Sequence, residues 1–352
     1  MVIKRDKKRI IKVGGVAIGG NNPIVIQSMV KVRSCDIERV LQQIIELRDA
    51  GCQIIRLALK DKDDALAFKK IKRKSRLPLV ADIHFDYRLA LMAIDYGADK
   101  VRLNPGNIYK KKEVAEIVSA LKSAGIPLRI GLNSGSVKGF GERGIDMPER
   151  LVKSALSYIK MIEGYKFRDI IISLKASNVL DTIAAYRKMA KVCDYPLHLG
   201  VTATGASFAG VIKSSIALGA LLLEGIGDTI RVSLTDKPVR EVYAAKAILE
   251  SLDLRSFGPQ IISCPTCGRC EVDLVKLVNT FENKVSSLSL KPIKVALMGC
   301  VVNGPGEAKE ADIGVAFGRR DGLLFRGGKP VRKVNFSECS NILLKEMENK
   351  DG

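Results

Sequence analysis

Four cysteines in the last third of the chain have the spacing of a metal site. Cys264 and Cys267 form a Cys-Pro-Thr-Cys motif, Cys270 follows at the same spacing, and Cys300 lies in the segment Met-Gly-Cys-Val-Val-Asn-Gly-Pro-Gly-Glu. Three or four thiolates from two loops favour metal binding. A structural zinc site is closed by four ligands, and iron-sulfur clusters are also held by cysteines. The spacing alone is therefore compatible with either zinc or an iron-sulfur cluster.

Cations interrupt several apolar runs of the first 235 residues. Burying such a charge without a partner costs several kcal/mol, so each cation needs a counter-charge. Asp82 is the obvious carboxylate near these runs, and acidic residues there are otherwise few, which favours a bound anion over carboxylate partners. The guanidinium fork matches phosphate oxygens and predicts a phosphate or diphosphate ligand. The cations are Arg56, Arg102, Arg129, Arg231 and, directly after a run, Lys175.

Loops that follow these runs contain Gly, Ser and Asn. Residues 104–107, 133–136 and 202–205 could bring backbone N–H groups close to phosphate oxygens. The two histidines of the chain, His84 and His198, also fall at or near the ends of runs, where barrel enzymes hold their active sites. We expect both histidines to hydrogen-bond a substrate.

Eight β-rich apolar runs alternate with helical segments, which predicts a parallel sheet. Helical segments are expected to stop at Gly51, Gly97, Gly125, Gly164 and Gly225, and the eighth helix is expected over residues 238–252. Eight units without a dinucleotide-binding glycine motif favour a closed (β/α)8 barrel of the TIM type over an open doubly wound sheet, which remains the alternative. The runs are residues 24–28, 54–58, 79–83, 100–103, 128–131, 170–174, 197–201 and 229–234.

Beyond residues 257–259 the pattern changes to short strands, Gly turns and clustered cysteines. We therefore predict an α/β barrel domain over residues 1–258 and a small α+β domain over residues 259–352. A length of 352 residues agrees with one large and one smaller domain.

The composition limits the classes of partner. The formal net charge is +20, but the chain has no Trp and 5% aromatic residues, which argues against a stacking platform for single-stranded nucleic acid. The most apolar stretch, residues 216–223, is shorter than the roughly 20 residues that cross a bilayer. Lys12 and Gly14 stand where a signal peptide needs an apolar region. We expect a cytoplasmic protein, with reduced cysteines, that binds neither membrane nor nucleic acid.

The sequence resembles the 4-hydroxy-3-methylbut-2-enyl diphosphate synthases of the non-mevalonate isoprenoid pathway. The resemblance covers nearly the whole chain. It is carried by six segments in order: Ala-Asp-Ile-His-Phe at 81–85, Arg-Leu-Asn-Pro-Gly-Asn at 102–107, Leu-His-Leu-Gly-Val-Thr at 197–202, Glu-Gly-Ile-Gly-Asp at 224–228, Cys-Pro-Thr-Cys at 264–267 and Gly-Cys-Val-Val-Asn-Gly-Pro-Gly-Glu-Ala at 299–308.

The resemblance implies an iron-sulfur oxidoreductase. It implies a [4Fe-4S] cluster held by Cys264, Cys267, Cys300 and the carboxylate of Glu307, with Glu307 also catalytic and Cys270 a bystander. The implied reaction opens the ring of 2-C-methyl-D-erythritol 2,4-cyclodiphosphate with two electrons and releases water. Ferredoxin or flavodoxin is the implied donor, and a homodimer with a composite site is expected, in which the cluster domain of one subunit covers the barrel mouth of the other.

The implied substrate agrees with the cations found independently, because a cyclic diphosphate needs several of them. The residues expected to bind it are Arg56, Asp82, His84, Arg102, Asn104, Arg129, Asn133, Lys175, His198, Thr202, Arg231 and Ser233.

Two departures from the family pattern stand out. Thr-Glu-Ala-Gly is expected after the seventh run, but the chain has Ala203 in place of the Glu, so a carboxylate that could contact substrate is missing. The first loop reads Val-Lys-Val at 30–32 instead of Thr-Asn-Thr and could bind differently. An inactive relative that still binds the cyclodiphosphate, and a zinc-ribbon RNA-binding protein that uses Cys270 as a fourth ligand, are the competing hypotheses.

Overall fold

The computed structural model describes residues 3–137, 144–286, 288 and 290–348. The chain divides into two compact units, Met1–Arg255 and Ser256–Gly352, each of which is described by itself. Among the helices of the described residues, none is long and apolar enough to cross a membrane.

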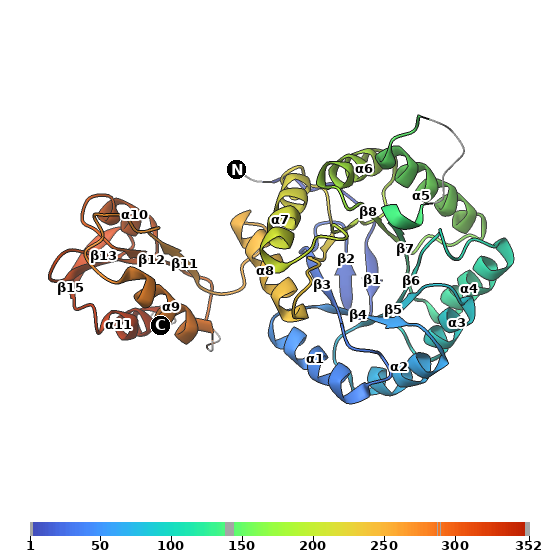
Figure 1. Cartoon of the computed structure of the whole chain (residues 1–352), viewed down its shortest axis with the longest axis horizontal. Coiled ribbons are helices and arrows are strands. Elements are labelled where there is room, and N and C mark those ends of the chain that lie inside the picture. The colour runs from blue at the N-terminus through green and yellow to red at the C-terminus, as the bar shows by residue number, and fades with distance from the viewer. Residues whose placement is uncertain (1–2, 138–143, 287, 289, 349–352) are drawn as a thin grey trace. The chain divides into compact units, whose positions relative to one another are not determined.

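The first unit is built around eight strands that pair in parallel, and the predicted (β/α)8 barrel is confirmed (Figure 1). The hydrogen-bonded order is β8-β7-β6-β5-β4-β3-β10-β9, and a parallel bridge between Ile172 and Leu197 joins its two ends. The strands are β3 (Val25–Met29), β4 (Ile54–Leu59), β5 (Leu79–Ile83), β6 (Lys100–Leu103), β7 (Leu128–Asn133), β8 (Ile170–Lys175), β9 (His198–Leu199) and β10 (Thr229–Ile230).

Eight helices follow the strands and form the outer ring of the barrel in Figure 1. Side chains of Asp36, Asp61, Asp86 and Asp146 cap the amino ends of four of them, as short acceptors do at an N-cap. The helices are α1 (Ile37–Asp49), α2 (Lys62–Lys74), α3 (Tyr87–Asp95), α4 (Lys111–Ala124), α5 (Met147–Gly164), α6 (Val179–Val192), α7 (Ser207–Leu223) and α8 (Pro238–Ser251).

A short hairpin that was not predicted precedes the barrel. Strands β1 (Ile11–Val13) and β2 (Val16–Ile18) pair antiparallel around a turn in which Gly14 has a φ of +56°. Side chains of the hairpin pack with Val25, Ile54 and Val80, which lie at or near the beginnings of β3, β4 and β5. The hairpin therefore covers the amino-terminal end of the barrel and leaves the other end for ligands. One 3₁₀ turn, η1 (Ser134–Ser136), follows β7.

The second unit is a five-stranded mixed sheet with helices, in order β11-β12-β13-β14-β15. The first three strands are parallel and the last two pairings are antiparallel, as expected of a small α+β domain. Phe281, Val295 and Leu343 are among the buried residues of its core. The elements are β11 (Gln260–Ser263), α9 (Leu274–Ser286), β12 (Lys294–Met298), α10 (Gly304–Glu310), β13 (Ile313–Phe317), β14 (Gly322–Arg326), β15 (Lys329–Val334) and α11 (Cys339–Glu348).

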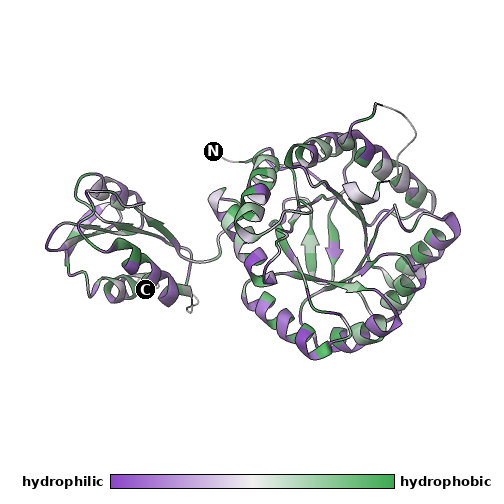
Figure 2. Cartoon of the chain, in the orientation of Figure 1, coloured by the Kyte–Doolittle hydropathy of each residue, from purple (hydrophilic) through white to green (hydrophobic). Residues whose placement is uncertain are grey.

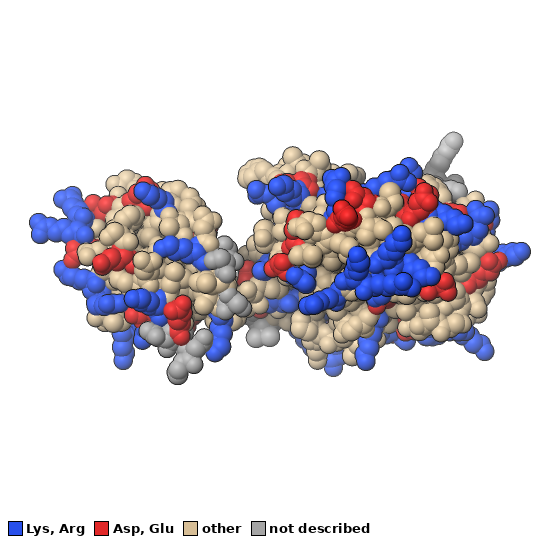
Figure 3. All heavy atoms as spheres, turned by 90° about the horizontal axis from the view of Figure 1, so that it is seen from below, with Lys and Arg blue, Asp and Glu red and all other residues tan. Residues whose placement is uncertain are grey.

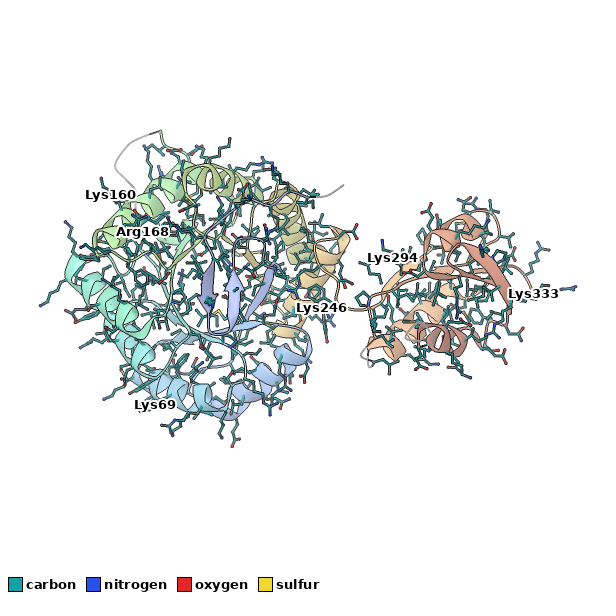
Figure 4. The ribbon with its side chains drawn as sticks, turned by 180° about the vertical axis from the view of Figure 1, so that it is seen from behind. Lys69, Lys160, Arg168, Lys246, Lys294 and Lys333 are labelled. Carbon is teal, nitrogen blue, oxygen red and sulfur yellow. The ribbon has the colours of Figure 1, made fainter. Side chains whose placement is uncertain are left out.

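Apolar and charged residues are separated as these folds require. Figure 2 shows hydrophobic residues along the strands, while the helices carry hydrophilic residues as well. Lys and Arg side chains occur over both units on the face drawn in Figure 3, with Asp and Glu among them. Lys69 of α2 and Lys160 of α5 lie on the outer ring of the barrel, and Lys333 lies at the edge of the second unit (Figure 4). Much of the positive charge is therefore exposed surface.

Candidate functional site

The carboxyl ends of the barrel strands surround a polar pocket with a volume of about 190 Å³. Every residue predicted to bind substrate lines it except Asn104 and His198. Met29, Ser173 and Val201 also line it and were not predicted. The lining residues are Met29, Arg56, Asp82, His84, Arg102, Arg129, Asn133, Ser173, Lys175, Val201, Thr202, Arg231 and Ser233.

Asp82, at the end of β5, is the central anion of the pocket. One carboxylate oxygen lies 3.0 Å from Nη1 of Arg102, and the other lies 3.5 Å from Nε of Arg56 and 3.7 Å from Nε2 of His84. Burial favours the protonated acid, but Arg102 and Arg56 outweigh it and hold the pKa of Asp82 well below its usual range. Asp82 is therefore an ionised group that orients two arginines on neighbouring strands.

Arg231 has a carboxylate partner that sequence reasoning missed. Its Nη2 lies 3.4 Å from Oε2 of Glu241, a residue of α8 that is 2% exposed. Asp82 was the obvious carboxylate near the strand ends in the sequence, and Glu241 is a second one. Glu241 lies ten residues beyond Arg231, in a helix, and only the return of α8 toward β3 and β10 brings it to the strand ends.

Within the described residues, the basic side chains of Arg129 and Lys175 have no carboxylate at ion-pair distance. Both are buried, Nε and Nη1 of Arg129 have no hydrogen-bond partner there, and no carboxylate of that part of the chain forms an ion pair with Lys175. Burial, together with Arg231 and Arg56, lowers the pKa of Lys175 well below its ordinary value. A bound anion would stabilise the charged forms of these two buried groups, as an anion-binding pocket requires.

Asn104 and His198 lie beside the pocket rather than in its lining. Oδ1 of Asn104 accepts hydrogen bonds from the Gly106 amide at 3.1 Å and from Oγ of Ser136 at 3.3 Å, so Asn104 joins two of the predicted loops. His198 is fully buried, and its Nδ1 lies 2.7 Å from Oγ1 of Thr229. Burial, reinforced by Arg129, lowers the pKa of His198 well below its usual value, which keeps the ring neutral. Their roles in substrate binding stay predictions.

The second unit holds a separate cavity, of about 200 Å³, lined by the predicted metal ligands Cys264, Cys267, Cys300 and Glu307. Cys264 follows β11, Cys300 follows β12, and Glu307 lies in the first turn of α10. Pro265, Thr266, Arg269, Met298, Gly299, Asn303 and Gly304 complete the lining. No three His, Cys, Asp or Glu side chains of the described residues are close enough to hold a single metal ion.

Cys270 is not among the residues that line this cavity. Its Sγ lies 3.2 Å from the carbonyl oxygen of Val272, and its side chain packs against the core of the second unit. A site of four cysteines that includes Cys270 would need its Sγ to turn from the Val272 carbonyl oxygen into the cavity. The arrangement instead offers three thiols and one carboxylate to the cavity.

The surroundings of two of the thiols lower their pKa and so favour the thiolate form. The Arg269 side chain, whose Nε donates to Sγ of Cys267 at 3.4 Å, lowers the pKa of that thiol. Backbone N–H groups of Asn303 and Val302 lower the pKa of Cys300. Because thiolates are the form that binds metal, and three thiolates with a carboxylate are a suitable ligand set for iron, these residues fit an iron-sulfur cluster.

Comparisons with known proteins agree with the two-unit architecture. Residues 8–246 match the GcpE TIM-barrel domain, and residues 260–349 match the GcpE protein C-terminal domain. Among solved structures, the barrel is similar to dihydropteroate synthase from Stenotrophomonas maltophilia, with a TM-score of 0.52 and 13% identity over 69% of this chain and 98% of that one. It is similar also to 3-dehydroquinate dehydratase from Geobacillus kaustophilus, with a TM-score of 0.50 and 15% identity over 70% of this chain and 99% of that one. At such identities the likeness concerns the fold alone.

Curated relatives are similar over nearly their whole length. A 4-hydroxy-3-methylbut-2-en-1-yl diphosphate synthase (flavodoxin) from Fusobacterium nucleatum is 51% identical over 97% of this chain and 98% of its own length. A protein of the same name from Brevibacillus brevis is 50% identical over 98% of this chain and 96% of its own. Two matching domains and relatives of this identity lead to one conclusion: the chain belongs to the GcpE family.

Proposed function

We propose that this protein is an oxidoreductase that converts 2-C-methyl-D-erythritol 2,4-cyclodiphosphate to 4-hydroxy-3-methylbut-2-enyl diphosphate and water, with two electrons delivered through a [4Fe-4S] cluster. The observation that carries the proposal is the coexistence, in one member of the GcpE family, of two candidate sites. One is a pocket with uncompensated buried cations, and the other is a cavity of three thiols and one carboxylate.

The barrel residues would bind and orient the diphosphate. A bound phosphate would supply Arg129 and Lys175 with the counter-charge that they lack in the described part of the protein. Arg56 and Arg102, which Asp82 holds in place, would donate hydrogen bonds to the phosphate oxygens. Asn133, Thr202 and Ser233 line the same pocket and could donate hydrogen bonds to the remaining oxygens. Since most of these groups are buried, binding would exclude water from the reacting end of the substrate.

The second unit would hold the cluster through Cys264, Cys267, Cys300 and Glu307. When bound, a cluster of this kind supplies electrons one at a time and a Lewis-acidic iron. Glu307 would be the one oxygen ligand of the cluster. Because a carboxylate is held by iron less firmly than a thiolate is, Glu307 would be the ligand that also serves in catalysis.

We propose flavodoxin as the electron donor, as the names of the relatives state for those proteins, with ferredoxin as the alternative. Such donors are acidic, and the +20 charge of this chain would steer them. We also propose a cytoplasmic location, since all eight cysteines are free thiols, as a reducing compartment keeps them.

The test of the activity is an anaerobic assay of the purified protein with the cyclodiphosphate and a reductant, with product identified by mass spectrometry. We expect about four irons per chain, an absorption band bleached by dithionite, and turnover. Glu307→Ala should abolish turnover, while the control Glu310→Ala, on the same helix but outside the cavity, should retain it. A protein that binds the cyclodiphosphate without turning it over would establish the inactive relative, in keeping with Ala203.

We propose a homodimer in which the cluster unit of one subunit covers the barrel mouth of its partner. An exposed apolar stripe along α7, made of Phe208, Ile212 and Ile216, supports contact with a second copy. Mixing Arg129→Met subunits with Cys267→Ser subunits tests the composite site, because each mixed dimer would retain one intact pair of units. Activity should return to about a quarter of the wild-type value; no recovery after subunit exchange would contradict the composite site.

A further inference from the structure

Lys31 lies in the first barrel loop, where this chain departs from the family pattern. It comes two residues after Met29, which lines the pocket. Its Nζ donates to the carbonyl oxygens of Leu234 at 2.6 Å and Asp236 at 2.5 Å, and lies 2.8 Å from Oε1 of Glu241. Since β3 and β10 are neighbours in the barrel, Lys31 ties the loop after β3 to the segment after β10.

Glu241 joins Lys31 to the pocket. Its side chain is 1% exposed, and Oε1 also accepts a hydrogen bond from the Leu234 amide at 2.9 Å. Oε2 lies 3.4 Å from Nη2 of Arg231, whose side chain lines the pocket. One buried carboxylate is thus shared by two cations, with the closer contact to Lys31.

The sharing determines how much positive charge Arg231 presents to a ligand. Lys31, Glu241 and Arg231 together carry one net positive charge, whereas Glu241 and Arg231 alone would carry none. Without Lys31, the carboxylate would keep a single cationic partner and would compete with any anion for Arg231. Buried and partly buried charges are screened weakly by water, so this difference should act on affinity.

We infer that Lys31 is a positioning residue for substrate binding, which holds Glu241 and the segment after β10 so that Arg231 stays available to the anionic substrate. This inference rests on the proposed function, and it deepens the description of that site.

Lys31→Met tests it in the cluster-loaded protein, by steady-state kinetics and by calorimetric titration with the cyclodiphosphate. We expect KM and Kd to rise about 5- to 20-fold while kcat changes less than about twofold, because binding is lost but the chemical step is not. Lys31→Arg should restore most of the affinity. Lys60→Met is the matched control, since Lys60 follows β4 at the same end of the barrel, outside the pocket lining, and its loss should leave Kd unchanged.

A double-mutant cycle with Glu241→Gln tests whether Lys31 acts through Glu241. It separates that effect from the loss of one positive charge and from a general loss of structure. In the Glu241→Gln background, Lys31→Met should weaken binding less than about twofold. The inference would be overturned by an unchanged Kd in Lys31→Met, or by an equal loss of affinity with and without Glu241. Turnover by the wild type would leave the proposed function intact in either case. Wild-type protein that neither binds nor converts the cyclodiphosphate would instead refute the proposed function itself, and the inference with it. Thermal unfolding of each variant identifies any that fails to fold.

Discussion

At the scale of single residues, the barrel interior holds a buried lysine that does not line the pocket. Lys100, the first residue of β6, is fully buried, and its Nζ lies 3.2 Å from Oε1 of Gln27. In the described part of the chain, no carboxylate forms an ion pair with it. Burial, with Arg129 and Arg56 nearby, lowers the pKa of Lys100 well below its ordinary value.

Replacing Lys100 by Met should therefore stabilise the protein. We expect the free energy of unfolding to rise by at least about 1 kcal/mol near pH 7. The pKa of Lys100 is lower in the native protein than the ordinary value of 10.5. At a pH between these two values the unfolded chain therefore binds more protons than the native protein does. The free energy of unfolding of the wild type consequently increases with pH through that window. The advantage of Lys100→Met should consequently shrink as pH rises toward 10.5. Urea unfolding across this range measures both effects, with Lys112→Met as an exposed control. A less stable Lys100→Met protein would contradict the idea of an unpaired cation.

Asp82 gives the opposite prediction, because it compensates two buried arginines. Asp82→Asn leaves Arg56 and Arg102 without their carboxylate and should cost about 3–5 kcal/mol of stability. Inorganic pyrophosphate should raise the melting temperature of Asp82→Asn more than that of the wild type, because a bound anion replaces the lost charge. Asp63→Asn, an exposed residue of α2, is the control. Equal pyrophosphate effects in Asp82→Asn and wild type would show that the pocket does not hold the anion near Asp82.

Several site residues could be predicted from the sequence because they break a local rule. A cation inside an apolar run, as at Arg56 or Arg129, is conspicuous without any structure. Lys100 was missed because the first residue of a strand is ordinarily near solvent, and Glu241 because a glutamate in a helix is ordinarily exposed. The contacts that make both residues unusual are formed only by the closed barrel.

At the scale of elements, two glycines leave room for long side chains of neighbouring strands. A side chain at Gly131 of β7 would collide with Nε of Arg102, which projects from β6, and one at Gly200 would collide with Nζ of Lys175, from the end of β8. The pocket thus depends on the pairing of small and cationic residues across adjacent strands.

Gly131→Ala tests this arrangement. The added methyl group would push Arg102 away from Asp82 and from the Gly131 carbonyl, to which its Nη2 donates at 2.7 Å. We expect a stability loss of about 1–3 kcal/mol and at least about tenfold weaker binding of the cyclodiphosphate. Gly219→Ala on α7, where nothing lies within 4 Å of the new atom, should change neither by a comparable amount. Wild-type affinity in Gly131→Ala would mean that Arg102 does not need its present position.

Element order could be predicted from the sequence more reliably than element length. The runs at 79–83 and 100–103 coincide with β5 and β6, but the run at 197–201 contains only the two residues of β9. An apolar run predicts which residues are buried, and Val201 is indeed buried. It does not predict which of them form the backbone hydrogen bonds of a strand, so the run is longer than β9. The hairpin of β1 and β2 escaped prediction because three-residue strands give too few positions for a period to show.

At the scale of the whole molecule, each unit has its own hydrophobic core. The second unit buries Phe281 of α9 among residues drawn from its own strands and helices, and the barrel buries Phe68 of α2. The domain boundary was predicted at residues 258–259 from the change of pattern, and the compact units divide after Arg255. The boundary could be predicted because each core is formed by residues of one continuous part of the chain.

Core substitutions should therefore act on one unit at a time. Phe281→Ala removes a fully buried ring and should destabilise the second unit by about 3–5 kcal/mol, and Phe68→Ala should do the same to the barrel. Hydrogen exchange followed by mass spectrometry reads the two units separately in the intact chain. Phe281→Ala should accelerate exchange within residues 256–348 while peptides of the barrel strands keep their wild-type protection, and Phe68→Ala should produce the reverse pattern. Equally faster exchange in both units after either substitution would show that the chain unfolds as one cooperative body. In that case, substrate bound in the barrel would also stabilise the fold of the second unit, which carries the proposed cluster ligands.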